Sequence, residues 1–200
     1  MAPDRAKHLG AVPLEESHPL KRRAFFGLPL PEEQRDGLAG YLAACASLAP
    51  AFRWVPPANL HITIRFLGGV DSELVDRLAD QLAATRGGGF EVEIGELGTF
   101  KRGRLVRVVW LGMRSGAEAA TQLASRVEAA CAAAGLPPEA RTFQPHLTLA
   151  RARSRDGDAL PSLPDLPPLA AWRAQELVLY QSHLGRAGAV YEPLRVLRLD

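Results

Sequence analysis

Two short segments of the chain share one pattern, in which a histidine and a threonine alternate with apolar residues. The first is HITI, residues 61–64, and the second is HLTL, residues 146–149. Successive side chains of a β-strand point to opposite faces, so the histidine and the threonine of each segment share one face. Each segment is therefore expected to be a strand with one buried face and one face that offers an imidazole and a hydroxyl.

Such a set of side chains suits acid–base chemistry on a phosphate. An imidazole has an unperturbed pKa of about 6.5, so near neutral pH one histidine can act as a base while the other acts as an acid. Threonine hydroxyls can donate hydrogen bonds to phosphate oxygens. If approximate two-fold symmetry brings the two polar faces to one cleft, the residues could cleave a phosphodiester by in-line displacement without a metal ion.

A structural explanation exists for each motif taken alone. One histidine on a strand is more often hydrogen-bonded in the core or at the surface, and threonine is simply a good strand former. The repetition of the whole pattern favours catalysis. A metal site built on the two histidines is an alternative, but no third histidine or nearby carboxylate is evident.

The surrounding sequence predicts the elements that would position these motifs. Proline and two glutamates open a helix after the first apolar strand, because proline suits the first turn of a helix and acids suit its positive end. Alternating and 3.6-residue periodicities then give the order β α β-β α β-β α β, loop, β-β. The expected segments are strands at 24–28, 90–97, 105–113, 174–184 and 191–199, helices beginning near 31 and 71 and ending near 135, a turn at 98–104, and a flexible proline-rich loop at 153–169.

The fold class expected from this order is α+β. Hairpin-like spacing favours antiparallel pairing over a doubly wound parallel sheet. Neither a GxGxxG segment after a strand nor a Walker motif occurs in the sequence. The helix that would begin near 31 has an apolar stripe of Leu38, Leu42, Cys45 and Leu48.

Composition is that of an ordinary globular chain. Its 200 residues, 47% hydrophobic with a net charge of +2, suit one domain or two small lobes and permit an anionic ligand without demanding one. Cys45 and Cys131 are expected to be buried free thiols. There is no apolar run of about 20 residues and no secretory signal, so a cytoplasmic protein is expected. Residues 1–22 are expected to form a mobile extension, and residues 23–200 a single bilobal domain.

The two motifs and their flanking segments resemble a known family. Together AFFGLPLP, NLHITIRFLG, RVVWLGM and FQPHLTLAR are similar to the RNA 2′,3′-cyclic phosphodiesterases of the 2H phosphoesterase superfamily, over about residues 23–199. This resemblance implies a bilobal 2H phosphoesterase fold, with two antiparallel sheets flanking a central cleft and helices outside. It implies hydrolysis of an RNA-terminal 2′,3′-cyclic phosphate to a 2′-phosphate without metal or other cofactor. In some members it implies weak, reversible 2′-5′ ligation.

Roles follow for the residues of the two motifs. We assign His146 as the base that activates water and His61 as the acid that protonates the leaving 3′ oxygen, and the reverse assignment stays open. Thr63 and Thr148 are expected to hold the phosphate oxygens.

Further residues are candidates for substrate contact. Arg151 lies at an odd offset from His146, so it reaches the cleft only if a bulge or turn interrupts the strand, although the family pattern favours a basic residue there. Arg65 lies at an even offset from the first histidine and is expected on the polar face. Phe26 is a candidate for base stacking, with core packing as its alternative, and Tyr180 for lining the cleft.

Other functions remain open at this stage. One is a phosphodiesterase of another small cyclic phosphate, and another is a non-catalytic module that binds RNA ends. The expected partners are RNA ends or cyclic nucleotides, without a membrane, and the protein is expected to be a monomer.

Overall fold

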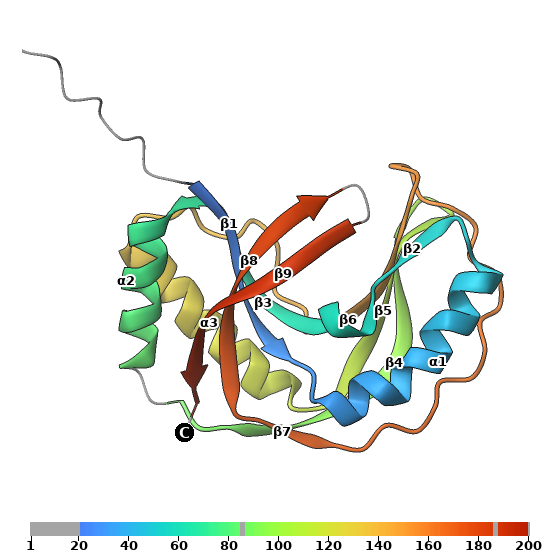
Figure 1. Ribbon diagram of the computed structural model, residues 1–200, viewed down its shortest axis with the longest axis horizontal. Helices are drawn as coiled ribbons and strands as arrows, with labels where there is room; N and C mark the ends of the chain where they lie inside the picture. Colours follow the sequence, from blue (N-terminus) through green and yellow to red (C-terminus); the bar gives the residue numbers. More distant parts are fainter. Residues whose placement is uncertain (1–20, 85–86, 186–187, 200) are drawn as a thin grey trace, which may run out of the picture.

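The computed structural model describes residues 21–84, 87–185 and 188–199. Within these ranges the chain forms three α-helices, one short 3-10 helix and nine strands (Figure 1). Their order is β1 (Lys21–Pro29), α1 (Glu32–Leu48), β2 (Phe52–Trp54), η1 (Pro57–Asn59), β3 (His61–Asp71), α2 (Ser72–Ala83), β4 (Phe90–Arg102), β5 (Leu105–Ser115), α3 (Ala117–Ala133), β6 (Leu147–Ala152), β7 (Trp172–Ala174), β8 (Glu176–Gly185) and β9 (Gly188–Arg198).

The strands form one antiparallel sheet that consists of two halves. The strand order is β7-β4-β5-β6-β3-β1-β8-β9, and β2 pairs with β6 on the edge of β6 that also pairs with β3. The two halves meet where β3 pairs with β6, and this pairing consists of Ile62 opposite Leu147. The α+β class and antiparallel pairing are thus confirmed, and the two expected sheets are continuous through one pair of residues.

The helices lie at opposite ends of the molecule. Figure 1 shows α2 and α3 together beside β1, β8 and β9, and α1 at the other end beside β2, β4 and β5. Because α1 follows β1 and α3 follows β5, each of these helices crosses to the half that does not contain the preceding strand. The buried side chains of both halves form one hydrophobic cluster.

Helix α1 begins as its sequence predicts, with Pro31 at the N-cap and two glutamates in the first turn. Its buried face includes Leu38, Leu42 and Cys45, as expected, together with Tyr41. The fourth residue of the expected stripe, Leu48, is 54% exposed because it lies in the last turn of the helix.

Several strand ends differ from the expectation by a few residues, most clearly at β1 and β4. Strand β1 begins at Lys21, inside the expected extension 1–22, of which residues 1–20 lie outside the described ranges. Strand β4 continues to Arg102, so the turn expected at 98–104 is confined to its last residues, where Gly103 has a φ of 59°.

Both thiols, Cys45 and Cys131, are buried and free.

The proline-rich segment 153–169 is packed against the protein instead of standing free. Every third residue from 160 to 169 is a partly buried leucine that packs against the hydrophobic core: Leu160, Leu163, Leu166 and Leu169. An isolated bridge joins Asp158 to Val106. The short strand β7, which the sequence did not predict, follows the segment and pairs with β4. No described helix is both long and apolar enough to cross a membrane.

Candidate active site

Both motif histidines lie at the junction between the halves of the sheet. His61 is the first residue of β3, and His146 directly precedes β6. The single β3–β6 pair, Ile62 with Leu147, follows each of them by one position. The charge of His146 affects the ionisation of His61, and the charge of Arg151 affects both. Segments 85 positions apart in the chain are therefore brought to one place.

The ring of His61 is oriented by two hydrogen bonds. Its Nδ1 lies 2.8 Å from the carbonyl oxygen of Asn59, and its Nε2 lies 3.0 Å from Oγ1 of Thr63. A carbonyl oxygen can only accept, so Nδ1 carries the proton of the neutral ring. Nε2 then accepts a hydrogen bond from the threonine hydroxyl, and its lone pair faces the side of the strand on which Thr63 lies.

His146 repeats this arrangement at its Nδ1 atom. The atom lies 2.7 Å from the carbonyl oxygen of Gln144, again two residues before the histidine. The neutral ring therefore donates from Nδ1 and keeps its Nε2 lone pair for a proton. Phe100 packs edge-on against this ring at a centroid distance of 5.1 Å, and Trp110 lies at 5.9 Å.

An aromatic cluster surrounds His61. Phe25 lies at 4.7 Å from its ring, Tyr191 meets it edge-on at 5.1 Å, and Tyr180 lies at 6.1 Å. Tyr180, the candidate for lining the cleft, thus lies beside the motif histidine. These rings restrict the imidazole and exclude water from one side of it.

The surroundings of both histidines disfavour the protonated, charged form of the imidazole. Burial lowers the pKa of His61 to about 4, an effect to which the positive charges of Arg151 and His146 add and which the Asn59 carbonyl opposes. Burial also lowers the pKa of His146, with the same arginine as a further cause. At neutral pH both rings of the free protein are neutral, so each presents an unprotonated Nε2.

A bulge in β6 brings Arg151 to the site. In the pairing with β5, Trp110 lies opposite Thr148 and Val109 lies opposite Ala150, so one residue of β6 is skipped between them. A bulge shifts the alternation of side chains by one position. Arg151 therefore turns away from the core, and its odd offset from the histidine does not exclude it from the cleft.

Strand β3 contains a corresponding bulge, which removes Arg65 from the polar face. Gly27 of β1 pairs with Thr63 and Phe26 pairs with Arg65, so Ile64 is skipped. Arg65 is only 9% exposed, and the expectation that it lies on the polar face is wrong. Phe66, five residues after the first histidine, occupies the position that corresponds to Arg151.

The same register corrects the expectation for Phe26. Opposite residues in neighbouring strands share a face. Phe26 lies opposite the buried Arg65 and has none of its surface exposed, so it belongs to the core and is not placed to stack on a substrate. Its neighbour Phe25 lies opposite Phe66 and Tyr180, on the side of the histidine.

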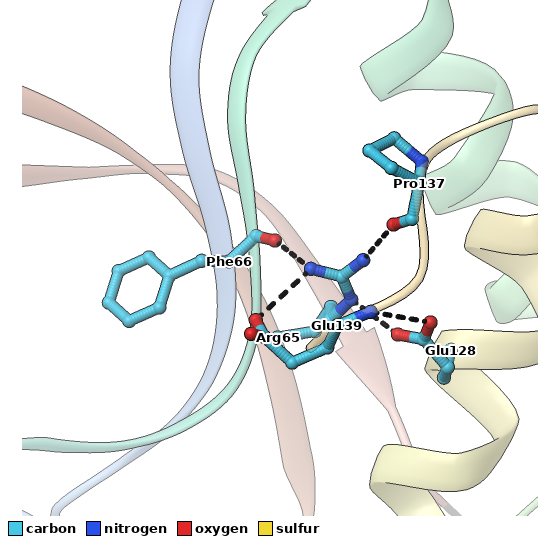
Figure 2. A network of polar contacts seen from close by, with 5 residues as sticks. All are labelled: Arg65, Phe66, Glu128, Pro137 and Glu139. Carbon is cyan, nitrogen blue, oxygen red and sulfur yellow. Dashed lines mark hydrogen bonds and ion pairs between the residues drawn. The ribbon is translucent and has the colours of Figure 1, made fainter. Parts of the chain in front are cut away.

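Arg65 instead ties β3 to the segment that precedes the second motif. Figure 2 shows its guanidinium bound to the carboxylates of Glu128 and Glu139 and to the carbonyl oxygens of Phe66 and Pro137. Glu128 is in α3, and residues 137 and 139 begin the segment that leads to His146. This network holds that segment beside β3.

Two hollows lie beside the histidines. One, of about 650 Å³, which we call the mixed groove, includes Thr63, Phe66, Phe100, Glu128, Arg141 and His146 in its lining. The other, of about 640 Å³, which we call the basic groove, includes Arg23, Arg53, Trp54, Arg151, Arg153 and Tyr191. Phe66 lines both grooves. Volumes of this size suit a nucleotide-sized ligand.

Several residues of the site were missed by the sequence reasoning. Phe100 and Tyr191 lack a motif, since aromatic residues in strands are most often core residues. Asn59 and Gln144 act through their backbone, which side-chain patterns do not reveal. Among the residues that the structure describes, no cluster of three histidine, cysteine, aspartate or glutamate side chains is arranged to hold a metal ion.

Comparisons with known proteins show the family of this chain. The family model of the 2′-5′ RNA ligase superfamily matches residues 35–186. An RNA 2′,3′-cyclic phosphodiesterase of Escherichia coli is 34% identical over 87% of this chain and 94% of its own length. That of Methanothermobacter thermautotrophicus is 32% identical over 90% and 100%.

Solved structures resemble the whole described fold. Escherichia coli LigT in complex with 3′-AMP superimposes with a TM-score of 0.76 and 32% identity, covering 90% of this chain and 98% of LigT. The protein TT0787 of Thermus thermophilus gives a TM-score of 0.74 and 28% identity, with 88% and 97% coverage.

Proposed function

Because the chain belongs to the 2′-5′ RNA ligase superfamily, we propose that it hydrolyses the 2′,3′-cyclic phosphate at the end of an RNA to a 2′-phosphate. The observation that carries this proposal is the convergence of His61, His146 and Arg151 at the junction of the two halves. Two imidazoles beside a cation suit proton transfer to and from an anionic phosphorus centre.

Water attacks the phosphorus in this mechanism while the bond from phosphorus to the 3′ oxygen breaks. Nε2 of His146 takes a proton from the water, because its Nδ1 is already committed as a donor to Gln144. Nε2 of His61, once protonated, gives its proton to the departing 3′ oxygen. The products are a 2′-phosphomonoester and a free 3′-hydroxyl. The reaction leaves His146 protonated and His61 neutral, and the protein returns to its starting state when His146 releases a proton to solvent and His61 takes one up.

The acid role of His61 requires the substrate. Its pKa of about 4 leaves the ring neutral in the free protein at neutral pH. An anionic phosphate bound beside the ring favours the imidazolium and raises this pKa. The Asn59 carbonyl, which accepts the Nδ1 proton, also stabilises the charged ring. The proton donor is thus formed when the phosphate binds.

Thr63, Thr148 and Arg151 hold the phosphate oxygens in this proposal. Thr148 lies on the same side of its strand as His146, as Thr63 does relative to His61. Arg151 has no carboxylate among the causes of its lowered pKa, which are burial and the neighbouring Arg107 and Arg141, with Tyr191 acting in the opposite direction. An unneutralised guanidinium is suited to an anionic substrate.

The decisive experiment is product analysis with a 2′,3′-cyclic mononucleotide and a short RNA that ends in a cyclic phosphate, in the presence of a chelator. A 2′-phosphate from both substrates is expected. A 3′-phosphate would reverse which oxygen leaves, and binding without hydrolysis would indicate a non-catalytic module. Activity that the chelator abolishes and added metal restores would replace the two-histidine mechanism with a metal-dependent one.

Three finer properties belong to the same proposal. An RNA 5′-hydroxyl in place of water would yield a 2′-5′ phosphodiester, which is the reversible joining reaction.

Both histidines come from one chain, so we infer that a monomer is active, which size-exclusion chromatography with light scattering tests. We infer a cytoplasmic location, and fractionation of cells tests it.

A further inference from the structure

The basic groove draws its charge from both halves of the sheet. Arg23 comes from β1, Arg53 from β2, Arg151 from β6, and Arg153 directly follows β6. Aspartate and glutamate are absent from the described residues that line it. None of the four arginines forms an ion pair within the described part of the chain.

Two of these arginines are held in an arrangement that is unfavourable without an anion. Arg53 lies directly opposite Arg151 in the pairing of β2 with β6. Like charges directly opposite one another in neighbouring strands destabilise a sheet. Of the two, Arg151 lies at the reaction centre, since its charge lowers the pKa of both histidines. A row of phosphates would relieve this repulsion.

The mixed groove has a different charge pattern. It is lined by the carboxylates of Glu128 and Glu139 as well as by Arg65 and Arg141. The carboxylates are already bound to Arg65, so this groove offers less attraction to a chain of phosphates. Charge therefore favours the basic groove as the path of a polyanion away from the histidines.

Aromatic side chains accompany the arginines along this path. Trp54 and Tyr191 line the basic groove, and Phe66, which lines both grooves, is 45% exposed. A basic groove with exposed rings is the arrangement that binds single-stranded nucleic acid without sequence preference, because every base has a face that can stack.

We propose that the basic groove binds the sugar–phosphate backbone of the RNA strand on the 5′ side of the terminal cyclic phosphate. This inference rests on the proposed function and adds a substrate class to it: the preferred substrate is an oligonucleotide, and a cyclic mononucleotide fills only the reaction centre. Arg23 and Arg53, on opposite halves of the sheet, contact internal phosphates.

The test compares a 2′,3′-cyclic mononucleotide with an oligonucleotide of four nucleotides that ends in a cyclic phosphate. The variants are Arg53→Gln and Arg23→Gln, with Arg173→Gln as the control that removes one exposed arginine from β7, at the far edge of the sheet. Each groove variant is expected to lower kcat/KM for the oligonucleotide about tenfold, to change that for the mononucleotide less than twofold, and to reduce the salt dependence by about one phosphate contact.

Binding of a fluorescent oligonucleotide, measured by anisotropy, separates this inference from the proposed function. Wild-type protein that hydrolyses neither substrate contradicts the proposed function, and anisotropy still tests the groove through the same variants. Hydrolysis of both substrates with equal efficiency, without salt dependence and with groove variants that match Arg173→Gln, overturns the inference alone. Circular dichroism of each variant confirms that the fold is retained.

Discussion

At the residue scale, the two motifs place chemically equivalent rings in unequal surroundings. Both imidazoles donate from Nδ1 to a carbonyl two residues earlier, so both neutral rings present Nε2. His61 also contacts the hydroxyl of Thr63 and three aromatic rings, and burial lowers its pKa to about 4. Two tetrapeptides that share the pattern His, apolar, Thr, apolar thus place their imidazoles in different surroundings.

Replacement of either histidine tests whether both imidazoles take part in the reaction. His61→Ala and His146→Ala are each expected to lower kcat by about 10²–10⁴, because each removes one proton transfer. His183→Ala is the control, since that ring is exposed and bound to Glu192 at 2.9 Å, away from the motifs. Steady-state hydrolysis of a cyclic mononucleotide measures the effect. More than a tenth of wild-type activity in either motif variant would remove that residue from the mechanism.

The pH dependence follows from the lowered pKa values. A productive encounter with substrate needs one protonated and one neutral histidine in the free protein. The pKa values of both histidines lie below the usual value of about 6.5. A bell-shaped profile of kcat/KM with its maximum on the acid side of pH 6.5 is expected. The bound phosphate raises both pKa values, so the profile of kcat should lie at higher pH. A maximum of kcat/KM above pH 7 would contradict the proposed environment of the rings.

At the element scale, paired bulges decide which side chains reach the site. Regular alternation places Arg65 beside the first histidine and turns Arg151 away from the second, and the structure reverses both. The sequence permits a bulge but does not position one, because the register depends on the neighbouring strands β1 and β5. The resemblance to the family named Arg151 as a candidate for substrate contact, and the bulge places this residue in the lining of the basic groove, whereas regular alternation turns it away.

The network around Arg65 makes a prediction for the link between β3 and α3. Glu128→Gln removes the closer carboxylate from a buried guanidinium and is expected to lower the free energy of unfolding by about 1–3 kcal/mol. Glu139→Gln is the matched control, because this carboxylate is 43% exposed and 3.4 Å away, and should cost less than about 1 kcal/mol. Urea denaturation measures both, and equal losses would contradict the dominance of Glu128.

At the scale of the whole molecule, the halves are interlocked. Helices α1 and α3 each cross to the half opposite their preceding strand, and one hydrophobic cluster runs through both halves. The histidines lie where the halves touch, so their separation depends on the packing of the entire chain. Neither half contains a complete set of catalytic side chains.

Cooperative unfolding is the expected consequence for residues 23–200. Thermal transitions followed by near-ultraviolet and by far-ultraviolet circular dichroism should coincide, because a shared core and crossed helices leave neither half able to unfold alone. Calorimetry should then give equal van't Hoff and calorimetric enthalpies. Two separated transitions would show that the lobes are independent domains.

The repeated motif, the periodicities and the capping residues were sufficient to predict the α+β class and most elements, and to place the two histidines and two threonines on or next to strands, because these features depend on local spacing. Only the tertiary structure decided the position of Arg65, Phe26 and Arg151, the aromatic cluster of Phe25 and Tyr191, and the two grooves. Strand register, helix crossing and burial arise from contacts between segments far apart in the chain, and these contacts leave no local pattern in the sequence.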